Sequence, residues 1–169
     1  MFDGCVLGVD PGIASAGLAV VARMQGRPRL VWSETVRTPG DQAEELRLRR
    51  VYEAVRQAIA EHRPGAVAVE RVMWGQNKTS ALRVARAAGV VMLAAADSGI
   101  PVQEYAPLEV KMAVTGVGNA DKQQVRSALS RAHRLGVVPD QADAADAAAV
   151  ALCHLQQAGL RRAVRAAVT

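Results

Sequence analysis

The sequence predicts an α/β fold in which helices cover both faces of a mixed five-stranded sheet. Three strand-like segments rich in apolar and β-branched residues come first, and helical and strand patterns then alternate before a helical C-terminal part. Consecutive strands pair antiparallel and helix-connected strands pair parallel, so the sheet should contain both kinds of pair. With 169 residues, 50% of them hydrophobic, the chain is long enough for one domain with a sizeable core.

The N-terminal elements are predicted over residues 5–10, 16–23 and 29–36, as an antiparallel meander. The turn-rich segment Pro-Gly-Ile-Ala-Ser separates the first two strands. A helix follows over residues 41–63, because apolar residues recur at helical spacing there and Pro64-Gly65 stops the pattern. The next strand, 66–71, is a continuous apolar run and should be buried on both faces.

The second half continues with a helix over residues 77–98, a strand over 101–106, and helices at about 107–114, 121–135 and 141–158. The order is therefore βββαβαβ and then helices. The 77–98 helix is rich in small residues along one stripe, which implies close packing against another helix: Leu82, Ala85, Gly89, Met92 and Ala96. We expect a single domain over residues 1–160 and a loosely ordered basic tail over 161–169.

The charge balance favours a polyanion as partner. The net charge is +5, and the remaining surface is more basic still if several acids belong to one site. Lys78, Lys111 and Lys122 are the lysines of the chain, the other basic residues being arginines, and all three fall in segments near the acids described next.

The two cysteines, Cys5 and Cys153, have neither disulfide-framework nor zinc spacing, which is typical of a reducing compartment. No leader pattern is apparent, and no apolar run is expected to reach transmembrane length. We therefore expect a soluble cytoplasmic protein without membrane contact.

Acidic residues occur where predicted strands would otherwise carry apolar side chains. Asp10 ends the first strand directly before Pro-Gly, and Glu70 lies at the end of the fourth. Burying ionised carboxylates costs several kcal/mol unless cations compensate. Asp143 and Asp146 share one face of the last predicted helix, one turn apart, and can converge on one ion. We interpret the four acids as one cluster for divalent metal ions.

An all-carboxylate donor set without His or Cys suits Mg²⁺. Two ions roughly 3.5–4 Å apart would activate a water molecule and stabilise the leaving 3′ oxygen at a phosphodiester. His154 lies on the same helical face as Asp143 but about 16 Å further along the axis, so a packing role is expected for it. The pattern indicates a metal-dependent nuclease with two ions in its site.

Five motifs in the same order resemble the RuvC family of Holliday junction resolvases over nearly the whole chain. They are Val-Asp10-Pro-Gly, Ala-Val-Glu70-Arg-Val, Glu-Tyr105-Ala with Val-Lys111, Gly116-Val-Gly-Asn-Ala-Asp-Lys122, and Ala-Asp143-Ala-Ala-Asp146-Ala. The resemblance implies a ribonuclease H-like fold, a homodimer with two active sites, and paired symmetric nicks in a four-way DNA junction with Mg²⁺ or Mn²⁺. It also implies RuvA and RuvB as a branch-migration partner.

By this resemblance the four acids are metal ligands and catalytic residues, and Lys111 and Lys122 match functional lysines of the family. Lys122 would act at the site, and both lysines would contact DNA phosphate. The loop after Glu70 carries Met73 and Trp74, followed by Lys78. The family often has Phe where this chain has Met73, so either Met73 or Trp74 could stack on a base. A place in the core or the dimer contact is the alternative for both.

Other functions fit parts of the pattern. An opening Val-Asp-Pro-Gly also occurs in actin-like ATPases, but those folds need two such lobes and this chain has one. Another ribonuclease H-like nuclease acting on RNA or an RNA–DNA hybrid is a closer rival. A non-catalytic junction-binding module is a third, although such a module would gain by losing acids from its DNA face.

Overall fold

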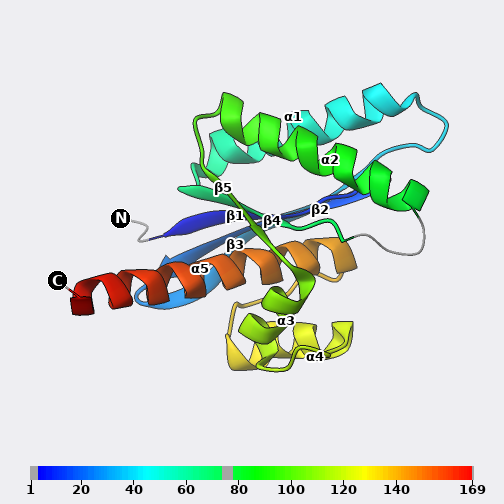
Figure 1. Ribbon diagram of the computed structural model, residues 1–169. Coiled ribbons are helices and arrows are strands. Elements are labelled where there is room, and N and C mark those ends of the chain that lie inside the picture. The colour runs from blue at the N-terminus through cyan, green and yellow to red at the C-terminus, as the bar shows by residue number, and fades with distance from the viewer. Residues whose placement is uncertain (1–3, 74–77, 169) are drawn as a thin grey trace.

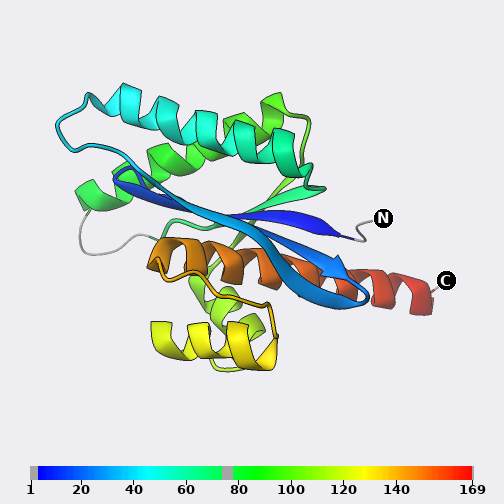
Figure 2. The same ribbon diagram turned by 180° about the vertical axis from the view of Figure 1, so that it is seen from behind.

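The structure is a computed structural model that describes residues 4–73 and 78–168 (Figure 1). A central sheet lies between two layers of helices, with α1 and α2 on one face and α3, α4 and α5 on the other (Figures 1 and 2). The predicted element order, βββαβαβ followed by helices, is confirmed. The predicted division into a domain over residues 1–160 and a tail stays a prediction.

The sheet has five strands in the order β3-β2-β1-β4-β5. Strands β1 (Cys5–Asp10), β2 (Ser15–Met24) and β3 (Arg27–Arg37) form the antiparallel meander. Strands β4 (Ala66–Glu70) and β5 (Val102–Tyr105) add on parallel to β1. The sheet is thus mixed, as the sequence predicts, and β1 lies at its centre.

Side chains alternate between the two faces along the central strands, as the pleat requires. Leu7, Val9 and Val67 are fully buried on the face covered by α1 and α2. Val6 and Ala68 are buried on the opposite face, in the core that includes α5. Burial of β4 on both faces confirms the prediction from its continuous apolar run.

The helices around the sheet are α1 (Glu44–His62), α2 (Lys78–Asp97), α3 (Pro107–Thr115), α4 (Lys122–Ser127) and α5 (Ala142–Val168). A π-helical turn, η1 (Ala128–Ala132), continues α4, and the His133 N–H donates to the Ala128 carbonyl oxygen five residues earlier. The single helix predicted over 121–135 is therefore divided in two.

The last helix is longer than its predicted range of 141–158, because α5 continues through Gly159 to Val168. A single glycine inside a helix costs only about 1 kcal/mol, and the flanking Ala, Leu and Arg residues are good helix formers. The predicted end of this helix at Gly159 is therefore wrong, whereas the loosely ordered tail over 161–169 stays a prediction.

Helix α2 is long and apolar enough, by length and composition, to cross a membrane. The expectation that no apolar run reaches transmembrane length therefore does not hold for α2. One such helix is weak evidence, since a core helix of a soluble protein meets the same criterion. Here α2 packs Ala87, Val91 and Ala94 into the core, and Arg86 on its surface binds Glu44 of α1.

Candidate metal-dependent nuclease site

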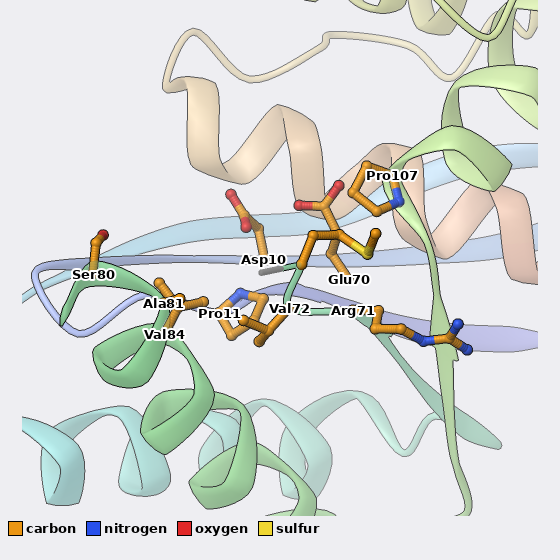
Figure 3. Close-up of a pocket in the computed structure, with 10 residues that line it drawn as sticks. Asp10, Pro11, Glu70, Arg71, Val72, Ser80, Ala81, Val84 and Pro107 are labelled. Atoms are coloured by element: carbon orange, nitrogen blue, oxygen red, sulfur yellow. The ribbon is translucent and has the colours of Figure 1, made fainter. Parts of the chain in front are cut away.

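The two strand acids lie side by side at the carboxyl ends of two neighbouring inner strands of the sheet. Strands β1 and β4 are parallel neighbours with Val9 opposite Val69, so Asp10 and Glu70 follow at the carboxyl ends of both. Both are half-buried, and Figure 3 shows their carboxylates on the same side of the strands, with Pro107 beside Glu70. Adjacent strand ends thus hold two carboxylates on one side of the sheet.

The helix acids reach these strand ends because α5 lies directly on β1 and β2. A methyl group at Gly8 would overlap the carbonyl oxygen of Ala147, and one at Gly17 would overlap that of Asp143. These two glycines have no side chain to separate helix from sheet. The first turns of α5, which carry Asp143 and Asp146, are therefore placed over the strands that lead to Asp10.

Each helix acid has a partner within the protein. The Ser15 hydroxyl donates a 2.5 Å hydrogen bond to Oδ2 of Asp143. Lys122 at the start of α4 donates from Nζ to Oδ2 of Asp146, at 2.8 Å. Both contacts join segments far apart in the sequence, and together they orient the acids of α5.

Burial and the charges of neighbouring acids raise the pKa values of both strand acids. Burial, followed by the negative charges of Glu70, Asp146 and Asp143, raises the pKa of Asp10 to about 7, while Lys122 acts in the opposite direction. Burial and the charge of Asp146 raise the pKa of Glu70, and Lys122 and Lys111 partly offset that rise. The four carboxylates therefore act electrostatically as one cluster, which two lysines partly neutralise.

The residues fit a divalent cation in charge and donor type. The cluster offers only carboxylate oxygens, the ligands that Mg²⁺ and Mn²⁺ accept. A cation would offset the burial and the repulsion that raise the pKa of Asp10. Within residues 4–73 and 78–168, no three such acids, histidines or cysteines already converge as the ligands of one ion. Asp143 and Asp146 are instead held by Ser15 and Lys122.

An open pocket of about 350 Å³ adjoins the strand acids (Figure 3). Asp10, Glu70 and Pro107 line one part of it, and residues of α2 such as Ser80 and Val84 line another. Met73 also lines the pocket and is 60% exposed, so its side chain is not part of the hydrophobic core. A base or sugar next to a phosphate bound at the acids would meet this apolar wall.

The other predicted DNA-contact residues are placed unequally. Lys111 is half-buried on α3 and close enough to Glu70 to affect its pKa. Lys78 is exposed at the N-terminal end of α2. Trp74 lies outside the residues that the structure describes. The choice between Met73 and Trp74 as the stacking residue stays a prediction.

Comparison with known proteins decides the family. Residues 6–154 match the family model described as crossover junction endodeoxyribonuclease RuvC. The protein of that name from Salinispora arenicola is 47% identical over 163 residues, which cover 96% of this chain and 93% of the relative. The one from Rhodococcus opacus is 49% identical over 154 residues, covering 90% and 82%.

The chain belongs to the RuvC family. The structure of Thermus thermophilus RuvC in complex with a Holliday junction substrate superposes on it with a TM-score of 0.85 at 36% identity, covering 92% of this chain and 94% of that one. The fold is therefore the ribonuclease H-like fold expected from the resemblance.

Several residues of this RuvC-family site are not evident from the sequence. Ser15, Pro107 and Ser80 carry no motif that distinguishes them, and only the folded chain brings them to the acids. His154 has the packing role expected of it: its Nδ1 lies 3.0 Å from the Tyr105 hydroxyl, with the two rings edge to face.

Proposed function

We propose that this RuvC-family enzyme resolves four-way DNA junctions by paired symmetric nicks, leaving 5′-phosphate and 3′-hydroxyl ends, in homologous recombination and DNA repair. The observation that carries the proposal is the electrostatic coupling of Asp10 to Glu70 on the neighbouring strand and to Asp143 and Asp146 of α5. The junction-bound Thermus thermophilus relative, similar over nearly its whole length, supports a four-way junction as substrate.

Asp10, Glu70, Asp143 and Asp146 would hold the metal, two Mg²⁺ or Mn²⁺ ions in each site. When bound, the ions would supply an activated water molecule and charge stabilisation at the leaving 3′ oxygen. The protein contributes oxygen donors on rigid elements and a half-buried setting that strengthens electrostatic interactions. The four acids and Lys122 are the residues to which we assign catalysis.

Cations next to the acids support binding of the substrate backbone. Lys122 lies at hydrogen-bond distance from Asp146, and Lys111 lies within electrostatic reach of Glu70. Both can attract a phosphate to the acidic cluster, which would otherwise repel DNA. Met73 would contact a base or sugar, and Lys78 a more distant phosphate.

We further propose a homodimer formed through α2. The stripe of Leu82, Ala85, Gly89, Met92 and Ala96 lies away from the core, and Leu82 is 49% exposed. Small residues on an exposed helix face allow close approach of a second helix, and a two-fold axis would bring two active sites to one junction. By family analogy, we also propose RuvA and RuvB as the branch-migration motor and the cytoplasm as the location of the protein.

The test is cleavage of a labelled mobile four-way junction with Mg²⁺ or Mn²⁺, beside linear duplex and an RNA–DNA hybrid. Wild type should produce ligatable symmetric nicks in the junction only. Asp146→Asn should abolish cleavage and retain or improve junction binding, because one negative charge is removed from the DNA face.

Each other outcome identifies a rival. Cutting of the hybrid would favour a nuclease for RNA substrates. Tight junction binding without cleavage by wild type would favour a binding module, and normal cleavage by Asp146→Asn would overturn the role of that acid.

A further inference from the structure

The hydrogen bond from Ser15 to Asp143 connects two parts of the site that only the fold brings together. Ser15 begins β2, directly after the turn that follows Asp10, whereas Asp143 lies in the first turn of α5. The serine is half-buried, and its hydroxyl donates to Oδ2 at 2.5 Å. The segment that follows Asp10 therefore holds the side chain of Asp143 through Ser15.

The turn that carries Ser15 is itself anchored. Thr38, a buried polar residue just after β3, donates from Oγ1 to the Ile13 carbonyl at 2.5 Å and from its backbone N–H to the Ala14 carbonyl at 3.1 Å. The Nε of Arg47 on α1 donates to the Thr38 hydroxyl at 2.9 Å. Buried polar contacts of this kind hold a loop in one conformation.

The backbone on the other side of the hydrogen bond is equally constrained. Gly17 lies two residues after Ser15, and there α5 approaches β2 so closely that no Cβ would fit against the carbonyl of Asp143. Donor and acceptor are thus both set on segments with little freedom to move. The remaining freedom is the rotation of the Asp143 side chain, which the hydroxyl restricts.

We propose that Ser15 is a positioning residue that orients Asp143 for divalent-cation binding. The hydrogen bond limits rotation of the carboxylate that would hold the cation. This inference rests on the proposed function, because it assigns Asp143 as a metal ligand. Partners of this kind restrict ligand orientation, and their removal typically weakens metal affinity about 10- to 100-fold.

The experiment measures Mn²⁺ affinity in the absence of DNA, from the electron paramagnetic resonance signal of free Mn²⁺. Ser15→Ala should bind Mn²⁺ about 10- to 100-fold more weakly than wild type. Ser15→Thr keeps the hydroxyl and should retain most of the affinity. Ser33→Ala is the matched control, since it removes a hydroxyl from a half-buried position on β3.

Junction cleavage gives a second readout. In Ser15→Ala the Mn²⁺ concentration for half-maximal cleavage should rise by the same factor, and the rate at saturating Mn²⁺ should recover. Circular dichroism and thermal unfolding of each variant separate this effect from misfolding.

Equal Mn²⁺ affinity in wild type and Ser15→Ala would overturn the inference. If Asp10→Asn still weakened Mn²⁺ binding in that case, the proposed function would stand. An equal loss in Ser15→Ala and Ser33→Ala would also overturn it. If Asp10→Asn left Mn²⁺ affinity unchanged, the proposed metal site would fail, and the inference with it.

Discussion

Lys122 donates a 2.8 Å hydrogen bond from Nζ to Oδ2 of Asp146, linking α4 to the acids of α5. The bond to Asp146 raises the pKa of Lys122, and the charges of Asp10 and Asp143 add to the rise. The lysine therefore remains protonated at neutral pH. It also opposes the repulsion within the cluster, because its charge lowers the pKa of both Asp10 and Glu70.

Replacing Lys122 by Gln should reduce junction cleavage by roughly 10²- to 10³-fold, the usual effect of removing one electrostatic contact to a transition state. Stability should change by less than about 1 kcal/mol, since the lysine side chain is 74% exposed and exposed ion pairs contribute little. Single-turnover cleavage and urea unfolding measure the two effects.

The control for Lys122→Gln is Arg126→Gln on the same helix, which removes an ion pair with Asp140. It should leave the rate of cleavage near that of wild type. Similar losses in both variants would show that α4 needs its positive charge only in general, against a specific role for Lys122.

The raised pKa of Asp10 predicts a pH-dependent stability. The group has an ordinary pKa of 3.8 when unfolded and about 7 when folded, so the folded state binds the proton more tightly. Below about pH 4 the protonated Asp10 makes its full contribution to the free energy of unfolding. As the pH rises to about 7, up to roughly 4 kcal/mol of that contribution is lost. The measurement is thermal unfolding of metal-free wild type and Asp10→Asn between these pH values.

Relative to wild type, Asp10→Asn should therefore become progressively more stable as the pH rises from about 4 to about 7. Added Mg²⁺ should reduce the difference at neutral pH, since a cation offsets the charge of Asp10. A difference that does not vary with pH would contradict the burial and repulsion assigned to this carboxylate.

Gly17→Ala should separate α5 from the sheet. The new methyl group would overlap the carbonyl oxygen of Asp143, which is backbone and has no rotamer by which to move aside. We expect a loss of about 1–3 kcal/mol in unfolding free energy, together with weaker cleavage. Gly40→Ala is the control, because a Cβ there meets no atom within 4 Å. Wild-type stability and activity in Gly17→Ala would refute the close contact.

Ala85→Glu tests the dimer proposed through α2. Ala85 is exposed, so the substitution should leave the fold of the monomer intact while placing like charges at a two-fold contact. Sedimentation should change from dimer to monomer, and paired nicks should become uncoupled single nicks. Thr79→Glu, exposed in the first turn of the same helix, is the matched control. A dimer that persists in Ala85→Glu would place the interface elsewhere.

Much of the fold and the four acids of the candidate site could be predicted from local patterns. Apolar runs identified the strands because buried sheets exclude polar side chains, and Asp10 and Glu70 stood out as exceptions to that rule. The spacing of Asp143 and Asp146 placed both on one helical face. The ends of helices were less predictable, as α5 shows by continuing through Gly159, because one unfavourable residue is outweighed by its neighbours.

Residue type and spacing along one element are enough to predict the element order, to single out the four acids and to carry the resemblance to RuvC. The hydrogen bonds of Ser15 to Asp143 and of Lys122 to Asp146, and the place of Met73 in the pocket, become visible only in the folded chain. Those contacts join residues far apart in the chain. The contact of Ser15 with Asp143 also depends on Gly8 and Gly17, which let α5 lie directly on β1 and β2, and no local pattern encodes that fit between surfaces.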